Sequence, residues 1–187
     1  MRVIAGKARS IPLKTPKTLR TRPTSDRIKE TLFNMMQPYL PGSIFLDLFS
    51  GSGGIGIEAL SRGAKSCVFV ENDREALNCL RDNLDKTKMT EEGQIVARDV
   101  MTALRLLDGK EVFDCIFMDP PYDKDIEKNV LNYLANSKLI NNLSLIVVEA
   151  SGDTDFDYLD DMGYALVKQK NYKTNQHLFI RRKKETV

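Results

Sequence analysis

The stretch Ile44-Phe45-Leu46-Asp47-Leu48-Phe49-Ser50-Gly51-Ser52-Gly53-Gly54-Ile55-Gly56 decides the fold of this chain. Its first half is short and apolar, which predicts a buried strand, and its second half is a glycine-rich turn that opens a helix. A strand that is apolar on both faces is typical of a parallel sheet covered by helices. The stretch therefore predicts one strand–turn–helix unit of an α/β protein.

The same alternation of strand and helix signals continues along the chain. Short apolar runs predict strands at 44–49, 67–71, 94–97, 113–118 and 143–148. Helical periodicity predicts helices at 55–62, 74–86, 100–107 and 125–135. The last part breaks this rhythm, because two strand-like runs joined by a polar turn occupy 164–170 and 177–182. We therefore expect a mostly parallel seven-stranded sheet with an antiparallel hairpin at its C-terminal edge.

The first forty residues differ from the rest and form a basic N-terminal extension. A small hairpin is expected over 2–13, and Thr24 or Ser25 is expected to cap a helix that two prolines end. The catalytic core is expected to span 41–187. At 187 residues and 42% hydrophobic content, the chain suits one domain. It shows neither a signal peptide nor a membrane-length apolar run, so we expect a cytoplasmic protein with no membrane contact.

Charge is distributed unevenly, although the formal net charge is only +2. Residues 1–40 hold nine Lys or Arg against two acidic residues, and the part after Ala165 is also basic, so the middle is acidic. Basic residues are commonly found on a solvated surface. At the C-terminal end, residues 181–187 fit a frayed tail as well as they fit a binding surface. In the N-terminal extension the bases are spread among glycines and prolines. This pattern predicts an extended surface that binds a polyanion through phosphate contacts.

The glycine-rich turn indicates a nucleotide-type cofactor without identifying it. Gly51 to Gly56 fit the dinucleotide fingerprint, with Glu71 about twenty residues later. However, Asp47 would repel a pyrophosphate from the strand end. S-adenosylmethionine carries a sulfonium and an ammonium group instead, which suit an acidic strand end. We therefore expect Asp47, Gly51 and Gly53 to surround the methionine part of this cofactor.

Two further acids follow the next strands. Glu71 is expected to bind the ribose, and Asp99 to accept from the adenine amino group. Each acid also has a structural explanation, since Asp47 can cap the turn and Asp99 can cap the helix that begins at Val100. Three acids at successive strand ends favour the cofactor interpretation, because ligands in such sheets bind outside those ends.

The fourth strand end carries the sequence Asp119-Pro120-Pro121-Tyr122, which predicts the chemistry. An exocyclic amino nitrogen of a base is a poor nucleophile, because its lone pair is delocalised into the ring. The Asp119 carboxylate and the Pro120 carbonyl can accept its two hydrogens, while Tyr122 stacks on the extruded base. A rigid proline turn is the structural alternative. Methylation of a cytosine carbon needs a thiol nucleophile, and no cysteine adjoins this turn.

Other reaction classes lack the residues they need. The chain has a single histidine, His177, which disfavours a zinc site or a serine triad, so no metal is expected. Its three cysteines lack metal-ligand spacing and lie in apolar segments. We interpret them as thiols packed in the interior.

These motifs together resemble a known family. The segment from Asp47 to Gly53 followed by Asp119 to Tyr122 is similar to the class I S-adenosylmethionine-dependent amino-methyltransferases, which have a Rossmann-like fold. The strings Arg2 to Gly6, Arg20 to Arg27 and Glu30 to Asn34 resemble the bacterial RsmD-type enzymes. The resemblance covers essentially the whole chain.

That resemblance implies a specific activity and further site residues. It implies methylation of the N2 amino group of a guanine in 16S ribosomal RNA, within assembling small subunits. It also implies that the segment containing Thr24 approaches the methionine end of the cofactor, and that Arg9, Arg20 and Arg22 lie near RNA. We further expect a monomer.

Three alternatives remain at this point. An adenine-N6 methyltransferase acting on RNA or DNA uses the same turn, although the chain leaves no room for a separate DNA-reading domain. A glutamine methyltransferase more usually has Asn in place of Asp119. An RNA-binding assembly factor with a vestigial core is disfavoured by the complete set of acids.

Overall fold

A central sheet of seven strands runs through the protein, in the order β3-β2-β1-β4-β5-β7-β6. The computed structural model describes residues 1–17, 26–121 and 125–183. The strands are β1 (Ile44–Leu48), β2 (Ser66–Glu71), β3 (Gly93–Ala97), β4 (Cys115–Met118), β5 (Leu145–Ser151), β6 (Tyr164–Asn171) and β7 (Asn175–Arg182). The helices are α1 (Asp26–Met36), η1 (Gln37–Tyr39), α2 (Gly54–Ser61), α3 (Arg74–Thr87), α4 (Val100–Leu107), α5 (Ile126–Ala135) and η2 (Asp157–Leu159).

The first five strands are parallel, and the last two are antiparallel. β1 pairs with both β2 and β4, and β4 pairs with β5. β7 lies antiparallel between β5 and β6. This arrangement confirms the predicted mostly parallel sheet with an antiparallel edge hairpin. The strand order reverses between β1 and β4, and ligands of open α/β sheets bind outside the carboxyl ends of the strands at such a reversal.

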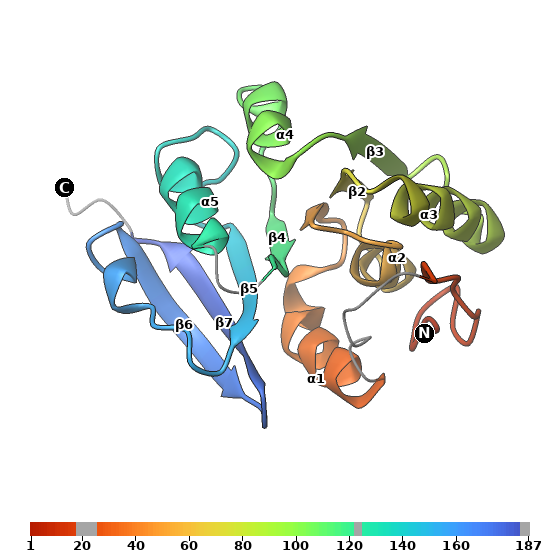
Figure 1. The fold of residues 1–187 in the computed structure, drawn as a ribbon, viewed down its shortest axis with the longest axis horizontal. Helices are drawn as coiled ribbons and strands as arrows, with labels where there is room; N and C mark the ends of the chain where they lie inside the picture. Colours follow the sequence, from red (N-terminus) through yellow and green to blue (C-terminus); the bar gives the residue numbers. More distant parts are fainter. Residues whose placement is uncertain (18–25, 122–124, 184–187) are drawn as a thin grey trace.

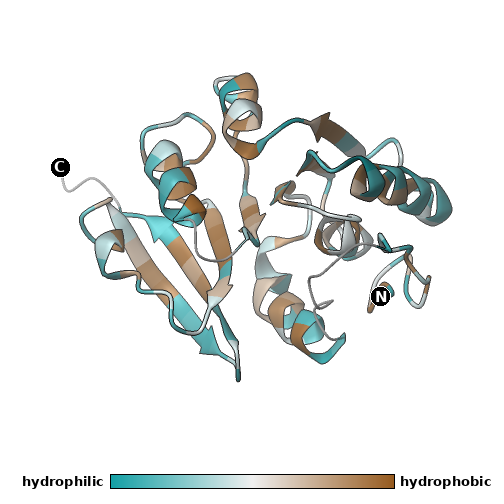
Figure 2. Ribbon diagram, in the orientation of Figure 1, coloured by the Kyte–Doolittle hydropathy of each residue, from teal (hydrophilic) through white to brown (hydrophobic). Residues whose placement is uncertain are grey.

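Helices cover both faces of the sheet and create two apolar cores (Figure 1). On one face α1, α2 and α3 pack against side chains that include Phe45, Phe117 and Phe179. On the other face α4 and α5 pack against side chains that include Leu46 and Ile116. Figure 2 shows the consequence, since the strands are largely hydrophobic while α3 turns a hydrophilic surface outward. Adjacent residues of a strand belong to different cores, because successive side chains of a strand point to opposite faces of the sheet.

The N-terminal segment, residues 1–17, lies beside α2 and α3 (Figure 1). The predicted hairpin is reduced to one antiparallel bridge between Arg2 and Pro12. The amide of Val3 donates to the carbonyl of Ile11 at 3.0 Å, so the two runs do meet. They form no longer ladder because the next amides of the segment donate to helix side chains instead.

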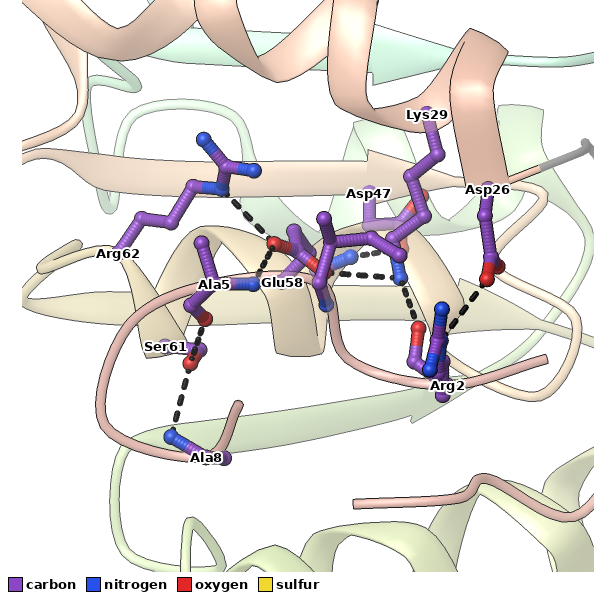
Figure 3. A network of polar contacts seen from close by, with 11 residues as sticks. Arg2, Ala5, Ala8, Asp26, Lys29, Asp47, Glu58, Ser61 and Arg62 are labelled. Atoms are coloured by element: carbon purple, nitrogen blue, oxygen red, sulfur yellow. Dashed lines mark hydrogen bonds and ion pairs between the residues drawn. The ribbon is translucent and has the colours of Figure 1, made fainter. Parts of the chain in front are cut away.

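Glu58 on α2 is the residue that holds this segment. Its two carboxylate oxygens accept from the amides of Ile4 and Ala5 at 2.7 and 3.0 Å. They also pair with Lys29 of α1 at 3.0 Å and with Arg62 at 2.8 Å. Lys29 and Glu58 are 1% and 0% exposed, so this ion pair is fully buried. Figure 3 shows the network between the N-terminal segment, α1 and α2.

The observed elements differ from the predicted ones mainly at their ends. β4 begins at Cys115, two residues later than predicted. β5 extends to Ser151, because its pairing with β7 continues to Asn175. The predicted cap of α1 lies outside the described residues. Among the helices that the structure describes, none is long and apolar enough to cross a membrane.

Candidate active site

The carboxyl ends of β1, β2 and β4 bring three of the predicted acids to one edge of the sheet. Leu48 of β1 pairs with Val70 on one side and with Met118 on the other. Asp47, Glu71 and Asp119 therefore lie around the point where the strand order reverses. Their charges act on one another, since Glu71 raises the pKa of Asp47 and Asp47 raises the pKa of Asp119.

The glycine turn connects this edge to α2. Gly53 has a φ of 83° and forms the start of α2. A Cβ atom at Gly53 would lie 2.4 Å from the Leu80 side chain, so glycine is required there for space as well as for conformation. Gly51 also has a positive φ, of 54°, but a Cβ atom there would meet nothing within 4 Å. The backbone at Gly51 is therefore open to a ligand.

Asp47 is buried beneath that turn, with only 1% of its surface exposed. Its Oδ2 atom accepts from the amide of Gly56 at 2.8 Å, which ties the strand end to α2. Burial is the main cause that raises the pKa of Asp47 to about 7, and the Gly56 hydrogen bond opposes it. Asp47 therefore fixes the position of the glycine turn against the end of β1.

Glu71 organises the same turn from the end of β2. Its Oε2 atom accepts from the amide of Gly51 at 2.7 Å, and its Oε1 atom accepts from the amides of Asn72 and Asp73, both at 2.8 Å. A carboxylate offers about four lone-pair positions, so these three bonds leave capacity for a ribose hydroxyl.

Asp99 follows β3 and is exposed. Its Oδ1 atom accepts from the amide of Thr102 at 3.0 Å and caps α4, which is the structural explanation that the sequence left open. This hydrogen bond is the main cause that lowers the pKa of Asp99. The carboxylate is therefore ionised and can still accept from a ligand at this edge.

Asp119 and Pro120 follow β4 directly, and Pro120 is buried. The Asp119 residue reaches solvent, yet the surrounding protein desolvates its carboxyl group. That desolvation is the largest cause that raises the pKa of Asp119 above its usual range, followed by the charges of Glu149 and Asp47. A carboxyl group with a raised pKa at a strand end is suited to accept a proton near neutral pH.

These residues fit S-adenosylmethionine better than a dinucleotide. The acids at the edge favour a cationic ligand and oppose a pyrophosphate, while the open backbone at Gly51 allows close approach. Among the described residues no group of three or more histidine, cysteine or acidic side chains could hold a metal ion.

Of the remaining predicted residues, the structure describes Arg9, which lies away from this edge. Arg9 is exposed and lies near the end of α2, where the amide of Ala8 donates to Ser61 at 3.0 Å. The turn that carries the site lies at the opposite end of that helix. Thr24, Arg20, Arg22 and Tyr122 lie outside the described residues.

Two buried polar groups near the site were missed by sequence reasoning. One is the Lys29–Glu58 pair, and the other joins Glu149 to His177 at 2.9 Å. The sequence held one usable signal for the second pair, because Glu149 is an acid near the end of a predicted strand, like the four acids already considered.

Known proteins resemble this chain over most of its length. The family model described as "Conserved hypothetical protein 95" matches residues 1–181. The YlbH protein of Bacillus subtilis is 41% identical over 150 residues, covering 80% of this chain and 82% of that protein. Ribosomal RNA small subunit methyltransferase D of Haemophilus influenzae is 35% identical over 173 residues, covering 91% of this chain and 88% of its own length.

A solved structure shows the same architecture. A protein from Thermus thermophilus superposes with a TM-score of 0.82 at 31% identity, covering 97% of this chain and 99% of that chain. The match extends over the N-terminal segment, the sheet and the edge hairpin together.

Proposed function

Because the chain belongs to the Conserved hypothetical protein 95 family, the family of RsmD-type methyltransferases, we propose that it methylates the N2 amino group of a guanine in 16S ribosomal RNA. It is a methyltransferase that uses S-adenosylmethionine. The observation that carries the proposal is the placement of Asp119 beside Asp47 and Glu71 at the reversal of the strand order.

The cofactor is held at the edge formed by β1, β2 and β3. Asp47 provides a buried negative charge for the cationic methionine part, and the backbone at Gly51 and Gly53 approaches the same part. Glu71 accepts from the ribose, and Asp99 accepts from the adenine amino group. Thr24 approaches the methionine end. When bound, S-adenosylmethionine supplies an activated methyl group on a sulfonium.

Asp119 and Pro120 orient the amino group that receives the methyl group. The Asp119 carboxylate and the Pro120 carbonyl accept its two hydrogens, which turns the nitrogen lone pair toward the methyl carbon. Tyr122 stacks on the extruded base. Alignment of the two reacting atoms supplies most of the acceleration, and no covalent enzyme intermediate is needed.

The basic N-terminal extension supplies affinity for RNA. Arg9 lies at one end of α2 and the cofactor turn lies at the other end. A long RNA can therefore contact Arg9 while its target base lies at the cofactor turn. The helix has eight residues, which corresponds to about 12 Å. The backbone before Arg9 is held against α2, because Glu58 accepts from the amides of Ile4 and Ala5 and Ser61 accepts from the amide of Ala8.

A methyl-transfer assay tests the function directly. Purified protein and S-adenosylmethionine with a labelled methyl group are incubated with small ribosomal subunits, or with protein-free 16S RNA, from cells that lack the enzyme. We expect incorporation at a single guanine, identified as N2-methylguanosine by mass spectrometry, with particles preferred over free RNA. N6-methyladenosine as the product would instead establish the adenine alternative, and no incorporation into either substrate would refute the proposal.

The salt dependence of RNA binding tests the basic surface. Single substitutions of Arg9, Arg20 and Arg22 by glutamine are each expected to weaken binding and to lower the slope of log K against log salt. The expected decrease is roughly 0.7 to 0.9 for each phosphate group that the protein no longer neutralises. The matched control is Arg105→Gln, which removes an exposed arginine from α4 on the opposite face of the sheet. Unchanged slopes in the variants of Arg9, Arg20 and Arg22 would exclude this surface. Light scattering of the purified proteins without RNA tests the expectation that the protein is a monomer.

A further inference from the structure

Four ionisable residues form a row across the sheet, from Asp119 to the exposed edge. Met118 pairs with Val148, so Asp119 and Glu149 occupy the next positions on neighbouring strands. Glu149 pairs directly with His177, and His177 pairs with Lys170. Neighbouring strands are about 4.8 Å apart, so each member of the row is one strand spacing from the next.

The members of the row share one face of the sheet. Phe117 lies two residues before Asp119, Val147 lies two residues before Glu149, and Phe179 lies two residues after His177. All three aromatic or aliphatic side chains belong to the core beneath α1. Because side chains two residues apart on a strand point to the same face, the acids and His177 point to that face as well. The ring of His177 also packs edge-on against Phe117, with centroids 6.5 Å apart.

Glu149 is held in one position by its hydrogen bonds. Its Oε1 atom accepts from the side-chain amide of Asn175 at 2.6 Å, and its Oε2 atom lies 2.9 Å from Nε2 of His177. The hydroxyl of Tyr172 lies 3.3 Å from Nδ1 of the same imidazole. Glu149 is 5% exposed and His177 is 0% exposed. These hydrogen bonds fix the position of the buried carboxylate.

The reaction requires that a proton leave the amino nitrogen. This inference rests on the proposed function. The nitrogen forms a bond to the methyl carbon as the carbon–sulfur bond breaks, and the electron pair of the broken bond stays on sulfur. The methylated nitrogen then releases one proton to a carboxylate oxygen of Asp119, which later returns it to solvent. A carboxylate takes this proton best when its proton affinity is matched to the working pH.

We propose that Glu149 and His177 are positioning residues for methyl transfer, because the pair holds a negative charge beside Asp119 and makes Asp119 a stronger base for the departing proton. His177 fixes the carboxylate of Glu149 from the side opposite to Asp119, and Asn175 fixes it from β7 as well. Neither Glu149 nor His177 touches the substrate in this role.

The electrostatic surroundings of Asp119 support this role. Desolvation raises its pKa most, the charge of Glu149 comes second and the charge of Asp47 on β1 third. Other ionisable groups of the described residues in this region are Lys170 on β6 and Tyr172 in the following turn. Glu71 on β2 and Lys29 on α1 both act on Asp47. Among the charged groups that raise the pKa of Asp119, Glu149 therefore has the largest effect.

The experiment is a direct titration of Asp119 without RNA. Protein labelled with ¹³C at aspartate and glutamate carboxyl groups is titrated by NMR, and Asp119→Asn identifies the resonance. We expect a midpoint above the ordinary range for aspartate in the native protein, and a decrease of about one unit or more in Glu149→Gln. Glutamine keeps the shape and a partner for both Asn175 and His177. The matched control, Glu127→Gln, removes a buried carboxylate from α5 on the other face and should leave the midpoint unchanged.

The pH dependence of methyl transfer provides the second readout. The acidic limb of the rate profile should move to lower pH by the same amount in Glu149→Gln, and the plateau should fall because Asp119 becomes a weaker base. An Asp119 midpoint that is equal in the native protein and Glu149→Gln would overturn the proposal and leave the pair as a clamp between β5 and β7. If Glu149→Gln does not fold, the native protein provides the test. The carboxyl resonance of Glu149 should then change its chemical shift at the pH where Asp119 titrates. A Glu149 resonance that does not respond to that titration overturns the proposal.

These outcomes separate the inference from the function on which it rests. A midpoint that shifts in a protein that does not methylate 16S RNA would refute the function and keep the coupling of Asp119 to Glu149. Methylation of 16S RNA with an unshifted midpoint would refute the inference alone.

Discussion

Replacement of Asp119 by alanine is expected to reduce methyl transfer by at least about 100-fold while leaving cofactor binding largely intact. The alanine removes both an acceptor for the amino hydrogens and the base for the departing proton. Asp47 and the glycine turn, which we propose hold the methionine part of the cofactor, lie on β1 and before α2, so this substitution should leave them in place. Single-turnover transfer of a labelled methyl group and calorimetry with S-adenosylmethionine measure the two properties separately.

Two further variants sharpen this result. Asp119→Asn keeps an oxygen that accepts an amino hydrogen but cannot take the proton, so its rate should lie between those of the native protein and the alanine variant. Asp85→Ala removes an exposed carboxylate from the last turn of α3 and should have the native rate. Transfer within tenfold of the native rate in an Asp119→Ala protein that binds the cofactor would refute the assigned role.

Replacement of Glu58 by alanine is expected to lower the free energy of unfolding by about 3 to 5 kcal/mol. The substitution leaves the ammonium group of Lys29 buried without its carboxylate, at a site where Lys29 is 1% exposed. The amides of Ile4 and Ala5 lose their acceptors at the same time. Urea unfolding followed by circular dichroism measures the loss. The total free energy of unfolding of a small domain is about 5 to 15 kcal/mol, so the expected loss is a large part of it.

Glu92→Ala is the matched control for this variant. Glu92 also holds the N-terminal segment, through an ion pair with Lys7, but the two side chains are 32% and 51% exposed. An exposed pair contributes about 0 to 1 kcal/mol, so the control should be nearly neutral. A double variant, Lys29→Met with Glu58→Gln, removes the unpaired charge and should recover part of the stability. Equal losses in Glu58→Ala and Glu92→Ala would contradict the buried-pair explanation.

Periodicity and turn residues were sufficient to predict the repeating part of the fold. The strand and helix signals located all seven strands of the described sheet, because apolar runs of strand length leave few alternatives to a covered parallel sheet. The four strand-end acids were also found, since a carboxylate after an apolar run is visible in the sequence. The ends of β4 and β5 were displaced, because a strand ends where its neighbour stops pairing and not where its own apolar run stops.

Long-range pairings were not predictable in the same way. Glu58 lies four residues before Arg62, a spacing that usually indicates an exposed ion pair on a helix surface. In the structure α1 and the N-terminal segment cover that surface and bury the carboxylate. The hairpin expected near the N-terminus has a single bridge for the same reason, because Ile4 and Ala5 donate to Glu58.

The sequence alone determined the fold class and the acids at the strand ends, and it predicted the chemistry of Asp119, because these depend on local patterns and on residue types. Only the folded protein showed that Glu149 and His177 stand in a row with Asp119 and that Lys29 meets Glu58. Residues 119, 149 and 177 are far apart in sequence and reach one face of the sheet only through the pairing of β4, β5 and β7. Register and burial together set the electrostatic environment of the candidate site.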